Sequence, residues 1–413
     1  MPDKKEMEFD FNGILFALSY ALDCVEHDLL GVTSNHGKRV AAIAMCVGNR
    51  MGVLTTNQER QILSACAVMH DCALSEYIQD EYDGSYVAAT GSFLKNFGRH
   101  CTMGEEAMKL MPFDPNGTKN VVLYHHENAD GSGPFRKKAD EIPQAARLIQ
   151  IADTIDATFD LSWMDDDKRQ RVRNYLNDQI GHLFAREEAE AFIDYINGIQ
   201  SFDLSFLRNE KIDIFLHNLL PGGTVTCTPR ELMDFAGVFA RIVDYKSHFT
   251  KNHSIGIAQK VYKMALYYQA DENLAAKLFF AGALHDIGKL VVDRDILEKP
   301  DQLNHAEYKH IQTHVYYTYK ILSDVSGLED ITKWAAYHHE KLDGTGYPFS
   351  LSTKDLGHWD RLMACLDIYQ ALTEERPYKK GMSHEDAVDI LRKMAEDGKL
   401  DAQIVADINQ IKP

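Results

Sequence analysis

The spacing of apolar residues predicts helices along most of the chain. Ahead of His285, Leu274, Leu278 and Ala281 recur at steps of three and four, which is the spacing of one helix face. His285 shares that inward face and is followed directly by Asp286. The chain shows no sustained alternation of apolar and polar residues, the pattern of a half-buried strand. We therefore predict an all-α protein.

The same spacing predicts an amphipathic helix over residues 8–30 and further helices over residues 165–220. Pro221-Gly222-Gly223 then breaks the chain. In Thr228-Pro229-Arg230-Glu231, a threonine cap, a proline at the first helical position and a glutamate three residues after the cap predict a new helix start. A domain boundary is expected between these two segments.

A set of histidine and aspartate motifs occurs twice in the same order. The landmarks are His36, His70-Asp71, His100, His125-His126 and Asp153 in the first copy, and His253, His285-Asp286, His314, His338-His339 and Asp367 in the second. Corresponding landmarks lie 213–217 residues apart, and ten of the eighteen histidines belong to them. We interpret the chain as a tandem duplication, with one helical domain in residues 1–222 and another in residues 223–413.

In the second copy, the landmark histidines fall on apolar helix faces. His314 shares a face with Ile311 and Thr318, and His338 shares one with Ala335. Imidazoles and carboxylates that converge in an apolar core are costly unless they coordinate a cation. Six or seven ligands per copy exceed one tetrahedral site, so we expect two metals that share a carboxylate. Such a pair can clamp a phosphoryl group and activate water, which predicts a metal-dependent phosphohydrolase.

The ligand types restrict the metal. Histidine and carboxylate without thiolate suit iron, manganese, zinc, cobalt or nickel better than calcium. We favour iron or manganese for the two ions of the second copy. Because the first copy keeps all seven of its landmark side chains, we expect a further metal there.

Composition restricts the partners and the compartment. The 413-residue chain has 62 acidic and 44 basic residues, and its formal net charge of −18 would repel duplex nucleic acid. No apolar run reaches the ~20 residues of a membrane span, and the N-terminus lacks the apolar core of a signal peptide. Seven scattered cysteines fit neither a disulfide framework nor a zinc ribbon. We expect a cytoplasmic protein; a homodimer is compatible with the sequence, which does not fix the oligomeric state.

These motifs resemble the HD-GYP family, the cyclic-dinucleotide phosphodiesterase branch of the HD superfamily of metal-dependent phosphohydrolases. The second copy carries His285-Asp286-Ile287-Gly288-Lys289, His338-His339-Glu340, Asp343-Gly344-Thr345-Gly346-Tyr347-Pro348 and Glu375-Arg376-Pro377-Tyr378-Lys379. The first copy resembles a divergent HD domain. The whole chain is therefore similar to proteins in which an HD domain precedes an HD-GYP domain, which implies two tandem HD-type helical domains.

The resemblance also implies roles for single residues of the second copy. A first metal would be held by His253, His285, Asp286 and Asp367, and a second by His314, His338 and His339, with Asp286 bridging the two. Asp286 and Lys289 would be catalytic, and the substrate would contact Lys289, Gly346, Tyr347, Arg376 and Lys379. The implied activity is the hydrolysis of cyclic di-GMP or 3′,3′-cyclic GMP-AMP to the linear dinucleotide.

The two copies depart from the family pattern in different ways. Phe249 stands where some members carry a glutamate for a third metal, which favours two metals in the second copy. Gln370 replaces an aspartate that the first copy keeps as Asp156. The first copy has Leu74 in place of Lys289, and it lacks the Gly-Tyr-Pro and Arg-Pro-Tyr-Lys elements. Its metal site could be structural, act on a different substrate or sense a signal.

Two other functions compete with cyclic-dinucleotide hydrolysis. One is a nucleotidase or other phosphohydrolase that acts on linear nucleotides, which uses the same chemistry. The other is a signalling scaffold that keeps vestigial metal sites. A scaffold is expected to lose metal ligands first, so fourteen retained candidates across both copies favour catalysis.

Overall fold

The computed structural model describes residues 7–30, 32–82, 98–198, 207–209, 211–220, 222–245, 253–297, 299, 301–375 and 380–413. Their contacts divide the chain into two compact units. The N-terminal unit is Phe11–Thr224, and the C-terminal unit combines Val225–Pro413 with the strand β1 (Met7–Asp10). The chain passes from one unit to the other two residues after the predicted boundary at residue 222.

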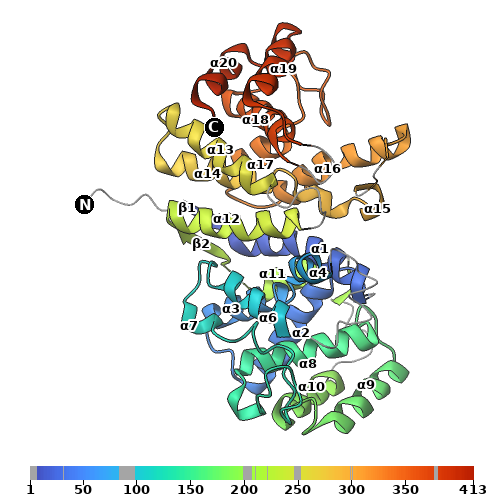
Figure 1. Ribbon diagram of the computed structural model, residues 1–413. Helices are drawn as coiled ribbons and strands as arrows, with labels where there is room; N and C mark the ends of the chain where they lie inside the picture. The colour runs from blue at the N-terminus through green and yellow to red at the C-terminus, as the bar shows by residue number, and fades with distance from the viewer. Residues whose placement is uncertain are drawn as a thin grey trace, which may run out of the picture. The chain divides into compact units, whose positions relative to one another are not determined.

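The N-terminal unit consists of helices. These are α1 (Phe11–Leu30), α2 (His36–Met51), α3 (Asn57–Val68), α4 (Leu74–Tyr82), α6 (Gly98–Met108), α7 (Pro115–Thr118), η2 (Ala139–Glu141), α8 (Gln144–Phe159), α9 (Asp166–Gln179), α10 (Arg186–Gly198) and α11 (Ile212–Leu219). Helix α2 is buried over most of its length and packs against α3, α8 and α10 (Figure 1). The core of this unit is therefore built around the helix that begins with His36.

The C-terminal unit repeats this helical design. Its further elements are β2 (Thr224–Cys227), α12 (Pro229–Asp244), α13 (His253–Tyr267), α14 (Glu272–Leu284), η4 (Ile287–Val291), α15 (Arg294–Leu297), α16 (His305–Ser323), α17 (Glu329–Ala336), α18 (His358–Thr373), α19 (His384–Glu396) and α20 (Ala402–Ile411). Helix α14 packs against α12, α13 and α17 and is buried from Ala275 onward, apart from Lys277. This burial confirms the prediction that Leu278 and Ala281 lie on the inward face of a helix.

Helix starts follow the predicted cap chemistry. Thr228 Oγ1 accepts a hydrogen bond from the backbone N–H of Glu231 at 3.3 Å, and the Glu231 carboxylate accepts the Thr228 N–H at 2.8 Å. The same capping box starts α3 and α16. Each box satisfies backbone donors that have no partner inside the helix. The predicted helix start at Thr228 is confirmed.

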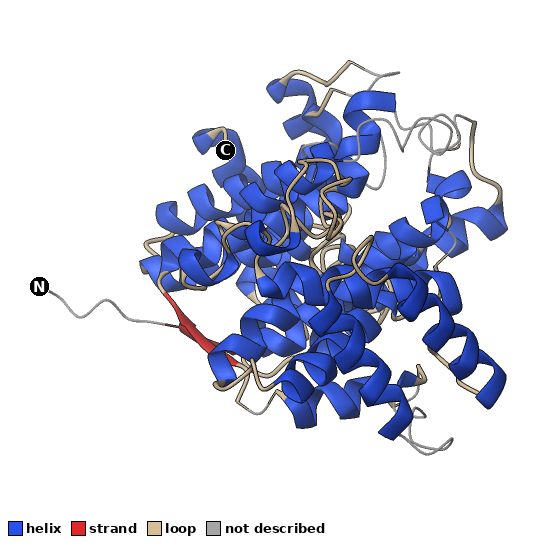
Figure 2. Ribbon diagram, turned by 90° about the horizontal axis from the view of Figure 1, so that it is seen from below, coloured by secondary structure: helices blue, strands red, loops and turns tan. Residues whose placement is uncertain are grey.

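The predicted helical character is confirmed, with one correction at the start of the chain. Residues 8–10, predicted as part of the first helix, belong to β1, which pairs with β2 in a two-stranded sheet (Figure 2). The buried Phe9 ring lies 6.0 Å from Phe235 and 6.4 Å from Phe280, centroid to centroid. Apolar and polar residues alternate in Met7-Glu8-Phe9-Asp10, and burial alternates with them, but this strand pattern is limited to four residues. The packing of Phe9 on Phe235 and Phe280 selects the strand over an extension of α1.

Among the helices of the described ranges, none is both long enough and apolar enough to cross a bilayer. This result agrees with the hydropathy of the sequence, in which no apolar run reaches ~20 residues.

Candidate metal centres

Seven side chains predicted as ligands meet in the C-terminal unit. They come from the start of α13, the end of α14, the start of η4, the middle of α16, the turn after α17 and the middle of α18: His253, His285, Asp286, His314, His338, His339 and Asp367. Six of them are buried and His339 is partly exposed. The fold therefore brings together seven side chains that are spread over more than a hundred residues of the sequence.

Asp286 lies between two groups of imidazoles in this C-terminal centre. One carboxylate oxygen lies 3.1 Å from His285 Nε2 and 3.6 Å from His253 Nε2. The other oxygen lies 3.2 Å from His314 Nε2 and 3.9 Å from His338 Nε2. A carboxylate in this position can give one oxygen to each of two neighbouring cations.

The ligand atoms on either side of Asp286 form two compact sets. His253, His285 and Asp367 make one set, and His314, His338 and His339 make the other. Within each set the atoms lie within 4.8 Å of one another. This division is the one that the family resemblance implies for a first and a second metal.

Backbone carbonyls orient the buried imidazoles. The Nδ1 atoms of His285, His314 and His338 lie 2.8, 2.6 and 2.6 Å from the carbonyl oxygen three residues earlier. Since a carbonyl only accepts, each Nδ1 carries the proton and donates, which leaves a lone pair on Nε2. Those three buried Nε2 atoms make no hydrogen bond with any residue that the structure describes. An imidazole held in this way fits a metal ion, and leaving its Nε2 without a partner would be costly.

The charge states suit metal binding. Burial lowers the pKa of His338 well below its usual range and lowers that of His339 to about 4, which keeps both neutral. Burial alone would raise the pKa of Asp286, but His285 and Lys289 hold it well below its ordinary value. Metal ligands must be deprotonated, and neutral imidazoles beside an ionised carboxylate meet this requirement.

His253 differs from the other histidines. Burial would lower its pKa, yet the carboxylates of Asp367 and Glu374 outweigh that effect and raise it to about 9. Its Nδ1 lies 3.0 Å from Glu374 Oε2, and its Nε2 lies 3.5 Å from Asp367 Oδ1. A metal ion held by Nε2 would take the place of its proton, while Glu374 would keep the ring oriented.

The residues predicted to contact substrate are placed in part. Lys289 Nζ lies 2.5 Å from Asp286 Oδ2, at the edge of the centre, and the Tyr347 ring lies 4.8 Å from that of His339. Gly346 has a packing role: a Cβ atom there would come within 2.5 Å of Glu340 Cα. Arg376 and Lys379 lie outside the described residues, as does Phe249.

The glutamate of the His-His-Glu motif holds the loop that follows it. Glu340 accepts hydrogen bonds from the backbone N–H groups of Phe349 at 2.7 Å and Leu351 at 2.9 Å. Glu127, the corresponding residue of the first copy, accepts from Phe135 at 2.6 Å and from Lys137. Both carboxylates are buried and satisfied, so their role is to hold the loop against the turn that carries the two histidines.

The N-terminal unit brings together its own seven candidates. They are His36, His70, Asp71, His100, His125, His126 and Asp153. One oxygen of Asp71 lies 3.2 Å from His100 Nε2, 3.3 Å from His125 Nε2 and 4.0 Å from His126 Nε2. Asp153 Oδ1 lies 3.0 Å from His36 Nε2 and 3.9 Å from His70 Nε2. The duplication therefore preserves a second cluster that could bind metal.

This N-terminal centre uses the same orientation of imidazoles. The Nδ1 atoms of His70 and His125 donate to the carbonyls of Ala67 at 2.8 Å and Val122 at 2.6 Å. Burial lowers the pKa of His125, so its imidazole is neutral, as a metal ligand must be. The residue corresponding to Lys289 is Leu74, which is fully buried and offers no charge. The N-terminal centre can thus hold a metal but lacks that cation for a phosphate.

The structure explains why Gln370 stands where the first copy has Asp156. In the N-terminal unit, Asp156 Oδ2 lies 2.6 Å from His36 Nδ1. In the C-terminal unit, Glu374, one turn beyond Gln370, orients the corresponding His253 instead. In the C-terminal unit the orienting carboxylate therefore stands four residues later in the chain, and Gln370 Nε2 donates a hydrogen bond to it at 3.3 Å.

Sequence reasoning missed two buried aspartates that fix the first histidine of each centre. Asp23 accepts the Gly37 N–H at 2.9 Å, and Asp244 accepts the Ser254 N–H at 3.0 Å. In each unit this carboxylate caps the helix that begins with the first histidine. The signal available in the sequence was weak: an aspartate flanked by apolar residues lies thirteen residues before His36 and nine residues before His253.

Comparison with known proteins agrees with this geometry. The family described as "HD domain" matches residues 32–174 and 237–404. The chain is 30% identical over 411 residues to the 3′3′-cGAMP-specific phosphodiesterase 1 of Vibrio cholerae, covering 97% of this chain and 91% of that protein. It is 36% identical over 160 residues to a cyclic di-GMP phosphodiesterase of Pseudomonas aeruginosa, covering 38% and 37%.

A solved structure shows the same fold. A crystal structure of a cyclic GMP-AMP specific phosphodiesterase of V. cholerae, V-cGAP3, superposes with a TM-score of 0.66 at 22% identity, over 99% of this chain and 98% of that one. The matches cover both copies of the duplication and agree with the clusters in each unit that could bind metals. The chain belongs to the HD-domain family of phosphohydrolases and is related over nearly its full length to the cyclic-dinucleotide phosphodiesterases.

Proposed function

We propose that the C-terminal unit hydrolyses a cyclic dinucleotide, 3′3′-cyclic GMP-AMP or cyclic di-GMP, to the linear dinucleotide. The observation that carries this proposal is the position of Asp286, whose two oxygens face two sets of buried histidines at 3.1 and 3.2 Å. The specificity of the relative that aligns over 97% of this chain supports the choice of substrate class. A homodimer stays a prediction.

Two iron or manganese ions fit the donor set of His253, His285, Asp286, His314, His338, His339 and Asp367, which contains imidazole and carboxylate only. Bound there, the cations would generate a nucleophile from water at neutral pH and neutralise charge on the phosphodiester. Backbone carbonyls hold three of the imidazoles with Nε2 turned to the centre. The protein thus supplies three imidazoles that are already oriented for coordination.

Lys289 contributes charge rather than a metal bond. Its ammonium group lies beside Asp286 at the edge of the centre, where a phosphate oxygen of the substrate would lie. A fixed cation there stabilises negative charge that develops on the phosphoryl group. Together with the motif residues Arg376 and Lys379, it offsets the acidic character of the chain for an anionic substrate.

Replacing Arg376 or Lys379 with alanine is expected to raise KM for the cyclic dinucleotide by about tenfold, since one lost ionic contact to a phosphate is worth roughly 1.4 kcal/mol or more. Neither residue is proposed as a ligand, so the metal content should not change. Steady-state kinetics with parallel metal analysis checks this expectation. A drop in metal stoichiometry in either variant would show that these residues support the centre and do not bind substrate.

Chromatography of reaction products tests the proposal. The purified, metal-analysed protein is incubated separately with both cyclic dinucleotides and with the linear dinucleotide. Conversion of a cyclic substrate to its linear form supports the proposal and identifies the preferred base. Release of phosphate from the linear compound alone would point to a nucleotidase, and no turnover of any of the three by metal-loaded protein would point to a scaffold.

A further inference from the structure

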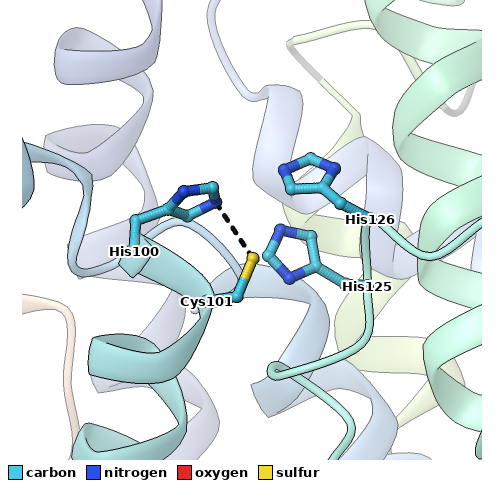
Figure 3. A group of neighbouring side chains, drawn as sticks. All are labelled: His100, Cys101, His125 and His126. Atoms are coloured by element: carbon cyan, nitrogen blue, oxygen red, sulfur yellow. Dashed lines mark hydrogen bonds between the residues drawn. The ribbon is translucent and has the colours of Figure 1, made fainter. Parts of the chain in front are cut away.

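The N-terminal centre contains a thiol that the predicted ligand set does not include. Cys101 follows His100 on α6 and is fully buried. Its Sγ lies 3.5 Å from His100 Nε2, and one ligand atom from each of His100, Cys101, His125 and His126 falls within 4.8 Å of the other three. Figure 3 shows the thiol between the α6 histidine and the two histidines of the following turn.

The C-terminal centre carries no sulfur at the same position. The residue after His314 is Val315, which is buried and apolar. Cys101 and Val315 occupy corresponding places in the duplication, next to the third histidine of each copy. The two centres therefore differ in donor chemistry as well as in the substrate-binding residues around them.

The spacing of these atoms fits one tetrahedral ion. Zinc binds thiolate sulfur at ~2.3 Å and imidazole nitrogen at ~2.0–2.1 Å, so the two donors of a tetrahedral site lie ~3.5 Å apart. The distance between Cys101 Sγ and His100 Nε2 is 3.5 Å. No shift of α6 is needed to bring both donors onto the same ion.

We propose that Cys101 is a metal ligand and that the N-terminal unit holds a zinc ion on His100, Cys101, His125 and His126. A thiolate favours a softer ion than the imidazole and carboxylate groups of the C-terminal centre. Four protein ligands fill a tetrahedral shell, as in structural zinc sites. Asp71, whose Oδ1 lies 3.2 Å from His100 Nε2 and 3.3 Å from His125 Nε2, then stays outside this shell as a neighbouring anion that balances the charge of the zinc. This zinc stabilises the N-terminal unit and takes no part in the hydrolysis proposed for the C-terminal unit.

Cobalt substitution of the full-length protein tests this inference. Co²⁺ replaces zinc in tetrahedral sites, and a cobalt–thiolate bond gives an intense near-ultraviolet charge-transfer band that imidazole and carboxylate do not give. The wild-type cobalt protein is expected to show this band even if Co²⁺ also fills the C-terminal centre. In Cys101→Val, which introduces the residue of the other copy, the band should disappear and the zinc content should fall by about one ion per chain.

Cys227→Ala provides the matched control, because Cys227 is also a buried thiol but lies in strand β2 of the C-terminal unit. This variant should keep both the band and the zinc. A wild-type cobalt protein without the band, or a band that survives in Cys101→Val, would overturn the inference, and the first result does not depend on the folding of any variant. Ring opening is measured separately, so a failure of the proposed hydrolysis leaves the spectrum interpretable.

Discussion

Replacing Asp286 with alanine is expected to lower the rate of cyclic-dinucleotide hydrolysis at least about a thousandfold, since metal-ion catalysis supplies several kcal/mol and ~4 kcal/mol corresponds to that factor. The two carboxylate oxygens lie 3.1 Å from His285 and 3.2 Å from His314, so both sets of ligands lose their shared anion at once. Initial rates of linear dinucleotide formation, with metal content determined on the same samples, give the comparison.

The matched control is Asp71→Ala, the same substitution in the corresponding motif of the N-terminal unit. Asp71 contacts the imidazoles of a centre to which we assign no role in ring opening, so this variant should keep the wild-type rate. Asp286→Ala activity within a few-fold of wild type would remove Asp286 from the reaction. Equal losses in both variants would mean that the two centres act together.

Arg39→Ala is expected to destabilise the N-terminal unit by roughly 3–5 kcal/mol, the usual cost of removing one partner from a buried ion pair. The Arg39 side chain has no exposed surface, and its Nε donates to Asp156 at 2.9 Å. Burial alone would raise the pKa of Asp156, but His36 and Arg39 lower it to about 2, so the carboxylate stays ionised. Alanine would leave this buried charge with no cationic partner other than His36 and with one backbone donor, the Leu161 N–H.

Urea unfolding of the full chain, followed by circular dichroism, measures this effect. Arg50→Ala is the control, because Arg50 also lies in α2 and pairs with an aspartate, Asp194, but with side chains 57% and 68% exposed. An exposed pair contributes little, so this variant should stay within about 0.5 kcal/mol of wild type. Similar losses of unfolding free energy in the two variants would show that burial does not make the Arg39–Asp156 pair more stabilising than an exposed pair.

The convergence of the candidate ligands in each unit could be predicted because the duplication repeats their motifs in the same order. A single buried imidazole is usually satisfied by a backbone carbonyl, so the expectation of convergence rested on the repeated order of the motifs, His253, His285 and His314 after His36, His70 and His100. The helical fold followed from the same periodicity.

Features that depend on tertiary partners could not be predicted. Strand β1 forms because Phe9 packs on Phe235 and Phe280, more than two hundred residues away. Whether Cys101 or only His100 points to the centre depends on the direction of two adjacent side chains on α6, which periodicity does not resolve. The contact between Glu374 and His253, which replaces that of an aspartate at position 370, joins residues far apart in the sequence and is visible only in the folded unit.

Reconstitution of the His100→Ala, His125→Ala double variant tests the central claim most directly. Both changes remove proposed zinc ligands of the N-terminal centre, so the metal of that unit is lost while the C-terminal ligands remain. The metal-free variant is titrated with Mn²⁺, and ring opening of the cyclic dinucleotide is followed against bound metal. We predict that activity is restored and reaches its maximum at about two ions per chain, the number that a shared carboxylate bridges. Ring opening that cannot be restored at any metal concentration, or that is already maximal at one ion per chain, would contradict a binuclear hydrolytic centre in the C-terminal unit.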